Sequence, residues 1–117
     1  MKTLKENRPI ARKKHKCMFC NGIIEIGQRY LKQTNIYDGT IGDFVCHQEC
    51  YTVADDLGMF DDCDPDYVLD EESFRDGIDQ YIYDNHFDDN TDDIKKEWQD
   101  MTKYQEVCKI YDELKNQ

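Results

Sequence analysis

Two short motifs decide the fold of this chain: Cys17-Met18-Phe19-Cys20 and, after a long interval, Cys46-His47-Gln48-Glu49-Cys50. The first is a Cys-x-x-Cys pair, and the second contains a His-x-x-Cys pair. Structural zinc sites surround the ion with four thiolate and imidazole ligands in a tetrahedron, and closely spaced pairs of this kind supply them. The sequence therefore predicts one structural zinc ion, held by Cys17, Cys20, His47 and Cys50.

The second motif offers two neighbouring residues, Cys46 and His47, as candidates for the third ligand. Cys46 and Cys50 are four residues apart, so on a helix they would also share a face and complete a four-cysteine site. We favour His47, because the alternating pattern before it indicates a strand that ends with Cys46 as a small buried residue. His15 is a weaker competitor for the fourth position.

The chain has 117 residues, and only 38% of them are hydrophobic, so its core must be small. A core of that size usually needs a metal ion or disulfides. The N-terminus shows no secretory signal and no apolar run is long enough to span a membrane, so we expect a cytoplasmic protein with reduced cysteines. Cys63 and Cys108 lie far from the two motifs and are interpreted as core or incidental thiols.

Charge is distributed unevenly along the chain, whose net charge is −11. Residues 1–50 hold nine lysines and arginines against five acidic residues, a net charge of +4. Residues 51–117 hold six against twenty-one, a net charge of −15. The first half alone is therefore suited to contact an anionic partner.

The order of local signals in the first half predicts a treble-clef arrangement. Asn21-Gly22 supplies a tight turn after the first pair, and Gly is expected to take the positive φ. Strands are predicted over residues 28–37 and 41–46, joined by a hairpin turn at Asp38-Gly39. A helix is predicted from His47 to Leu57, ending at Gly58, with the second ligand pair in its first turn.

The second half is predicted to be helical. One helix is expected over residues 71–86, a short one beginning at Thr91, and a last one beginning near Thr102. The fold class is thus α+β, a treble-clef-like zinc module followed by an acidic extension of about three helices. The expected divisions are a basic arm over residues 1–16, the zinc module over 17–58, and the acidic helical region over 59–117, packed on the zinc module as one domain.

The aspartate-rich segment around residue 90 partly matches a calcium-binding EF-hand loop. Asp88, Asn90 and Asp92 occupy the first three alternating positions. However, Asp93 stands at the sixth position, where Gly is required, and Gln99 replaces Glu at the twelfth. We interpret the segment as a solvated acidic loop.

No catalytic constellation accompanies the predicted zinc site. A zinc deaminase would show His-x-Glu with a later Cys-x-x-Cys, and this pattern is missing from the sequence. A treble-clef endonuclease needs a further catalytic histidine beside the metal, and the whole chain has only three histidines. The expectation is therefore that the protein is not an enzyme.

The ligand spacing resembles that of the Cys-Cys-His-Cys zinc finger of poly(ADP-ribose) polymerases. Residues 10–57 are also similar to small uncharacterised proteins of phages and mobile elements, in three motifs: His15-Lys16-Cys17, Tyr37-Asp38-Gly39 and His47-Gln48-Glu49-Cys50. These resemblances imply the same four zinc ligands. The polymerase fingers recognise DNA breaks, but through surface residues that do not map onto this chain.

Three functions follow as hypotheses. The first is a non-enzymatic binding module of phage or mobile-element type, whose tyrosine-rich acidic half meets a protein partner. The second is nucleic-acid binding by the basic first half, with contacts from Arg12, Lys13, Lys14 and Lys16. The third is an acidic half that mimics DNA towards a basic host protein and inhibits it.

Overall fold

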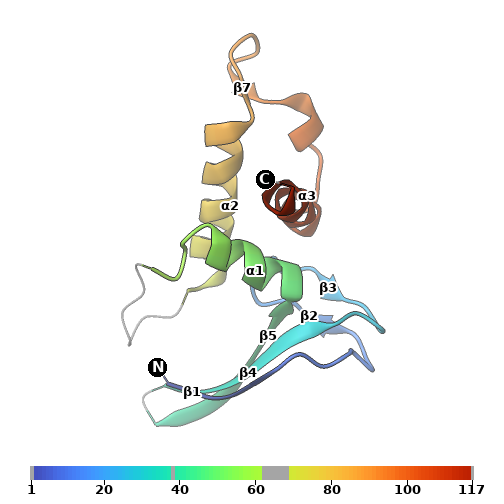
Figure 1. Ribbon diagram of the computed structural model, residues 1–117, viewed down its shortest axis with the longest axis vertical. Helices are drawn as coiled ribbons and strands as arrows, with labels where there is room; N and C mark the ends of the chain where they lie inside the picture. The colour runs from blue at the N-terminus through green and yellow to red at the C-terminus, as the bar shows by residue number, and fades with distance from the viewer. Residues whose placement is uncertain (1, 38, 62–68, 117) are drawn as a thin grey trace.

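The chain folds into a mixed α+β structure, as the sequence predicts, in a computed structural model that describes residues 2–37, 39–61 and 69–116 (Figure 1). A three-stranded antiparallel sheet has the order β1-β4-β5, and two short hairpins are formed by β2 with β3 and by β6 with β7. The strands are β1 (Lys2–Asn7), β2 (His15–Lys16), β3 (Ile23–Ile24), β4 (Tyr30–Tyr37), β5 (Thr40–His47), β6 (Phe87–Asp88) and β7 (Asp93–Ile94). The helices are α1 (Gln48–Asp56), α2 (Glu71–Asn85), the 3₁₀ turn η1 (Lys96–Trp98) and α3 (Lys103–Lys115).

The β4–β5 hairpin has the predicted position. Its register runs without a shift from the pair Tyr30 and His47 to the pair Tyr37 and Thr40. Gly39 has φ +79, the left-handed conformation that a tight hairpin turn requires, whereas Asp38 lies outside the described residues. This hairpin places His47 at the end of β5, directly before α1.

The N-terminal segment is not the separate arm that the sequence suggested. Strand β1 pairs antiparallel with β4 and forms an edge of the sheet. Further along, the amide of Ala11 donates to the carbonyl of Gln28 at 2.8 Å, and Ala11 is 3% exposed. Residues 3–7 are exposed, so this edge strand carries no apolar alternation. Its pairing therefore leaves no signal in the sequence.

Helices α2 and α3 begin close to where the sequence predicts, because both have strong N-caps. The Asp70 carboxylate accepts a hydrogen bond from the Ser73 amide at 2.8 Å. Thr102 caps α3 in a reciprocal capping box with Gln105. These bonds satisfy backbone amides that would otherwise lack partners in the first helical turn.

The helix expected from Thr91 does not form. Residues 87–94 make the β6–β7 hairpin instead, in which the Thr91 amide donates to the Asp88 carbonyl at 3.3 Å. The Asp88 carboxylate accepts from the Asn90 amide at 2.9 Å, and Asp92 has φ +57. Asp and Asn favour turns because their side chains bond to nearby backbone amides, and here that preference overrides the helical spacing.

One continuous core joins the half that carries the two cysteine motifs to the acidic half, and α1 lies between the sheet and the helices α2 and α3 (Figure 1). Phe19, from the first cysteine motif, is 2% exposed and stacks on Phe74 of α2, with ring centroids 4.6 Å apart. The ring of Phe44 on β5 meets Phe19 edge-on at 4.9 Å. A side chain between Cys17 and Cys20 thus anchors the acidic half.

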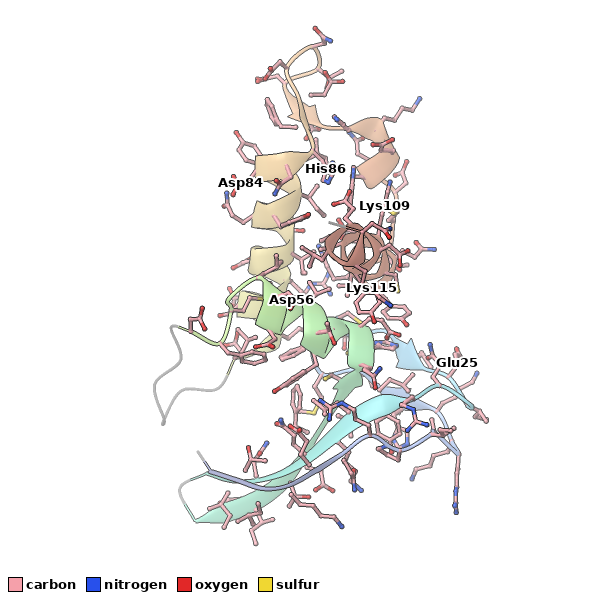
Figure 2. All side chains as sticks on the ribbon, in the orientation of Figure 1. Glu25, Asp56, Asp84, His86, Lys109 and Lys115 are labelled. Carbon is pink, nitrogen blue, oxygen red and sulfur yellow. The ribbon has the colours of Figure 1, made fainter. Side chains whose placement is uncertain are left out.

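A second cluster of side chains holds the far end of the helical half (Figure 2). The His86 ring stacks on the buried Trp98 at 4.3 Å and contacts the Glu113 carboxylate at 2.9 Å. Lys109 Nζ lies over the Trp98 ring, 4.5 Å from its centroid. The Tyr81 hydroxyl donates to Glu113 at 2.9 Å, and burial together with this bond raises the pKa of Tyr81 to about 12.

Substituting Phe19→Ala tests whether the two halves unfold together. Loss of the ring removes the stack on Phe74 and leaves a cavity, so we expect the free energy of unfolding to fall by about 3–5 kcal/mol. Urea titration followed by far-UV circular dichroism measures this change. The matched control is Ile26→Ala, at a residue that is 64% exposed, with an expected change below about 0.5 kcal/mol. Two separate transitions in the wild type would contradict the shared core.

Candidate metal centre

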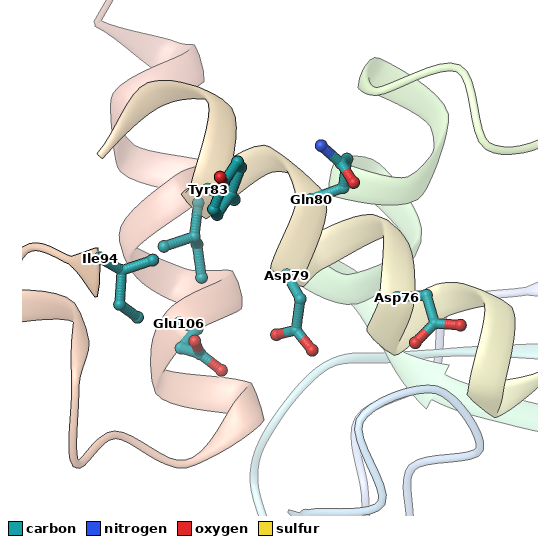
Figure 3. Close-up of a pocket in the computed structure, with 7 residues that line it drawn as sticks. Asp76, Asp79, Gln80, Tyr83, Ile94 and Glu106 are labelled. Carbon is teal, nitrogen blue, oxygen red and sulfur yellow. The ribbon is translucent and has the colours of Figure 1, made fainter. Parts of the chain in front are cut away.

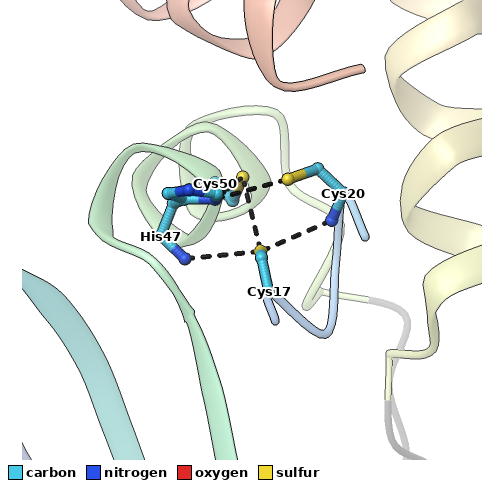
Figure 4. A group of neighbouring side chains, drawn as sticks. All are labelled: Cys17, Cys20, His47 and Cys50. Carbon is cyan, nitrogen blue, oxygen red and sulfur yellow. Dashed lines mark hydrogen bonds between the residues drawn. The ribbon is translucent and has the colours of Figure 1, made fainter. Parts of the chain in front are cut away.

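The four predicted ligands meet at one buried point (Figure 4). Cys17 and Cys20 lie on the turn after β2, His47 ends β5, and Cys50 lies in the first turn of α1. All four residues are at most 4% exposed, and their ligand atoms lie within 4.8 Å of one another. This cluster could hold a metal ion.

The distances between the donor atoms fit a tetrahedral ion. Metal–sulfur bonds of about 2.3 Å and a metal–nitrogen bond of about 2.0 Å would separate two sulfurs by about 3.8 Å and a sulfur from the nitrogen by about 3.5 Å. The Sγ atoms of Cys17 and Cys50 are 3.9 Å apart. His47 Nδ1 lies 3.3 Å from Cys20 Sγ and 3.8 Å from Cys50 Sγ. The side chains therefore need only small adjustments to bind one ion.

Backbone amides around the first cysteine motif favour thiolates. The amides of Cys20 and His47 donate to Cys17 Sγ at 3.5 and 3.4 Å, and the Gly22 amide donates to Cys20 Sγ at 3.4 Å. Hydrogen bonds from the side chains of Cys20 and Cys50 hold the pKa of Cys17 far below its usual range. Thiolate is the form of cysteine that binds metals, so this environment prepares the ligands.

The ring of His47 is held in the orientation that a metal ligand needs. Its Nε2 atom lies 3.1 Å from the Ile23 carbonyl, to which it donates, so Nδ1 is left to face the sulfurs. Burial alone would lower the pKa of His47, but the hydrogen bonds to Cys17 and Cys20 outweigh it and raise this pKa to about 10. The sulfurs thus attract positive charge to the position that a metal ion would take.

Cys46 does not belong to the cluster, which resolves the ambiguity in favour of His47. Successive residues of a strand point to opposite faces, so the side chain of Cys46 turns away from that of His47. Cys46 is fully buried in the core, and burial raises the pKa of its thiol well above the usual range. His15 is also excluded, because its ring packs against Tyr30 at 4.9 Å.

The remaining cysteines lie apart from the metal centre. Cys108 is a half-buried free thiol on α3, where burial raises its pKa. Cys63 lies outside the described residues.

The turn after the first cysteine pair differs from the predicted one in a single detail. The positive φ of +64 belongs to Asn21, whereas Gly22 has an ordinary backbone conformation. Asn tolerates the left-handed region better than most residues. An added Cβ at Gly22 would lie 3.4 Å from Cys20 Sγ and 3.7 Å from the Cβ of Tyr104, which are ordinary van der Waals contacts.

Tyr104 of α3 covers the metal centre, a contact that the sequence did not indicate. Its ring stacks on the His47 ring with centroids 3.7 Å apart and planes 18° apart. The Tyr104 hydroxyl donates to the Glu49 carboxylate and accepts from the Gln28 amide, both at 3.3 Å. Burial raises the pKa of Tyr104, so the phenol keeps the proton that it donates. In the sequence, Tyr104 falls at the helical spacing of apolar residues, so it looks the same as an ordinary core residue.

Helix α2 also contacts the first cysteine motif. Arg75 Nη1 donates to the Cys20 carbonyl at 3.3 Å and lies 3.7 Å from the Glu71 carboxylate. The backbone that carries the metal ligands is therefore supported by both acidic helices, through Arg75 and Tyr104.

The four basic residues expected to contact nucleic acid fall into two groups. Arg12 and Lys13 are exposed and line a groove beside β4. Lys14 approaches the Glu25 carboxylate at 3.9 Å. Lys16 is exposed on β2 and pairs with Ile23 of β3. The structure thus places only Arg12 and Lys13 along one surface.

Comparison of the chain with protein-family models, curated proteins and solved structures finds no match. Within the part of the chain that the structure describes, no helix has the length and apolar character needed to cross a membrane. Any function must therefore be inferred from the geometry of the chain itself.

Metal analysis of the purified protein tests the ligand set. We expect one zinc ion per chain in the wild type and in Cys46→Ala, because the Cys46 thiol takes no part in the cluster. His47→Ala should lose the ion, since removal of one of four ligands opens the tetrahedron. Inductively coupled plasma mass spectrometry measures the metal content. Loss of metal from Cys46→Ala with retention in His47→Ala would reverse the assignment.

Two substitutions at Tyr104 test whether the stacked ring supports the metal ligands. Tyr104→Ala removes the stack on His47, and we expect zinc affinity to fall about 10- to 100-fold, as for other residues that orient a ligand. Tyr104→Phe keeps the ring and loses only the hydroxyl bonds, so it should cost about 1 kcal/mol of stability and little affinity. Competition with a chromophoric zinc chelator measures the affinity. Equal affinities for the two variants would contradict a role for the ring.

Proposed function

We propose that this protein is a zinc-stabilised, non-enzymatic binding module. Three thiolates and one imidazole in a buried tetrahedral arrangement are the ligands that structural zinc prefers. The observation that carries the proposal is the closed centre. Four protein ligands fill the tetrahedron and the Tyr104 ring packs against His47, so a bound ion offers no position to water or substrate.

Zinc would serve this module by supplying free energy of folding. The four ligands come from two segments that are far apart in the sequence, the turn at Cys17 and the junction of β5 with α1. Binding one ion therefore ties the hairpin, the first helix and the N-terminal turn together, in a chain whose own core is small.

The surface that we assign to a protein partner is a groove beside α2 (Figure 3). Its lining combines carboxylates with apolar side chains: Asp76, Asp79, Gln80, Ile82, Tyr83, Ile94 and Glu106. Lys103 forms ion pairs with Asp79 and Glu106. Asp76 is exposed and has no ion-pair partner among the described residues, so the groove keeps unneutralised negative charge.

Tyr83 is the side chain in this groove best placed to recognise a partner. It is 56% exposed, whereas Tyr81 and Tyr104 are bonded to Glu113 and Glu49 and pack within the domain. A cation placed over an exposed aromatic ring gains about 0.5–1 kcal/mol. An aromatic ring, an apolar floor of Ile82 and adjacent carboxylates together suit a lysine or arginine in a basic segment of another protein. A phage or mobile-element setting, implied by the sequence resemblance alone, would be compatible with such a role.

The groove can be tested with a short fluorescein-labelled peptide of alternating arginine and glycine. Tyr83→Leu removes the ring without changing the charge, so we expect the peptide to bind about two- to fivefold more weakly. Asp76→Asn should weaken binding further, because it removes the unpaired carboxylate. Fluorescence anisotropy measures both affinities.

The matched control is Asp89→Asn, which makes the same change in charge at an exposed carboxylate in the β6–β7 turn. If Asp89→Asn weakens binding as much as Asp76→Asn, and Tyr83→Leu has no effect, the peptide responds only to the net negative charge. That result would contradict a specific groove. The same comparison of variants would also reveal binding of the peptide to acidic surfaces outside this groove.

A further inference from the structure

A second groove, with the opposite charge, lies on the other face of the main sheet. It is bounded by the segment of residues 9–15 and by strands β4 and β5, and its volume is about 1120 Å³. Lys32 and Val45 line it, whereas their strand neighbours Leu31 and Cys46 are fully buried in the core. Because neighbouring strand residues point to opposite faces, the groove faces away from the core.

Four cations line this groove, which we name the basic groove: Arg12, Lys13, Arg29 and Lys32. Arg12 and Lys13 are exposed and have no ion-pair partner among the described residues. Among the described residues that line the groove, the only acidic one is Asp43, whose carboxylate lies 4.0 Å from Lys32 and accepts from the Thr34 hydroxyl at 3.0 Å. The balance of charge in the groove is therefore clearly positive.

The segment that carries Arg12 and Lys13 is held in place. Ile10 and Arg29 form a β-bridge, and the Tyr30 amide donates to the Pro9 carbonyl at 3.0 Å. Ala11, which precedes the two cations, exchanges hydrogen bonds with residues 27 and 28 and is buried. These contacts fix the backbone before a ligand arrives, so binding would cost little ordering entropy.

The acidic helices do not surround this groove. Helix α1 separates the sheet from α2 and α3, so the positive first half and the negative second half of the sequence form two poles (Figure 1). A polyanion could approach the sheet face without meeting the carboxylates of α2. The two grooves are thus separate sites.

We propose that the basic groove binds the phosphate backbone of a single-stranded nucleic acid. Guanidinium groups match phosphate oxygens in geometry, and Arg12 and Arg29 are both exposed here. The same lining contains an apolar side chain, Ile10, which is 53% exposed, and the His15 ring, which packs at a tilt against Tyr30. Apolar and aromatic surface beside cations suits unpaired bases, which a duplex does not present.

Anisotropy of a fluorescein-labelled single-stranded oligonucleotide tests this proposal on the zinc-loaded full chain. The variant Arg12→Ala/Lys13→Ala removes the two cations without ion-pair partners. We expect it to weaken binding about tenfold or more at low salt, and to lower the slope of log affinity against log salt concentration by about 1.4, or 0.7 for each lost contact. Both residues are exposed, so circular dichroism and zinc content should match the wild type.

The matched control is Lys95→Ala/Lys96→Ala, which removes two exposed lysines from the acidic half. This variant should bind the oligonucleotide as the wild type does. Equal weakening by both variants, or no measurable binding by the wild type, would overturn the proposal.

Three further measurements distinguish a single-stranded nucleic acid from other possible ligands of the basic groove. A duplex of the same sequence that binds more tightly than the single strand would overturn the single-stranded assignment. Polyglutamate that competes as well as the oligonucleotide would assign the groove to an acidic protein segment. Self-association of the wild type in sedimentation velocity, lost in Arg12→Ala/Lys13→Ala, would assign it to the acidic pole of a second copy. Failure of any of these tests leaves the peptide groove beside α2 unaffected, because the two sites share no residue.

Discussion

The structure depends on the position of a single imidazole, that of His47. Its Nε2 atom is bonded to the Ile23 carbonyl, its Nδ1 atom faces the sulfurs, and its ring is covered by Tyr104. The same residue ends β5 and precedes the first turn of α1. Any shift of the ring would therefore disturb the hairpin, the helix and the contact with α3 together. A buried polar ring of this kind is tolerated only when each nitrogen has a partner.

The acidic helices are part of the domain because they bury apolar side chains against the half that carries the candidate metal centre. Phe74, Val107 and Ile110 are fully buried, although α2 and α3 carry many carboxylates on their outer faces. Apolar burial contributes about 25 cal/mol for each Å² removed from water, which offsets the mutual repulsion of exposed charges screened by salt. Phe19 and Tyr104 carry this packing directly to the cysteine motif and to His47.

The uneven charge of the sequence becomes two oppositely charged surfaces in the fold. Charges of mixed sign spread over a surface create no strong local potential, whereas charges of one sign gathered on one surface do. The shared core holds α2, which lines the groove beside it, and the strands β4 and β5, which line the basic groove, on opposite sides of α1.

The sequence by itself determined the features that depend on local spacing. The ligands on the Cys-x-x-Cys turn, the preference for His47 over Cys46, the hairpin at Gly39 and the cap at Thr102 all follow from residues a few positions apart. The β6–β7 hairpin that forms in place of a predicted helix is also a local choice, made by Asp and Asn side chains that bond to nearby amides. The tertiary structure alone decided two features: the pairing of β1 with β4 and the Tyr104 ring on His47. Both join residues far apart in the chain. The hydrophobic periodicity of the sequence does not reveal such contacts, because their free energy comes from surfaces that meet only after the chain has folded.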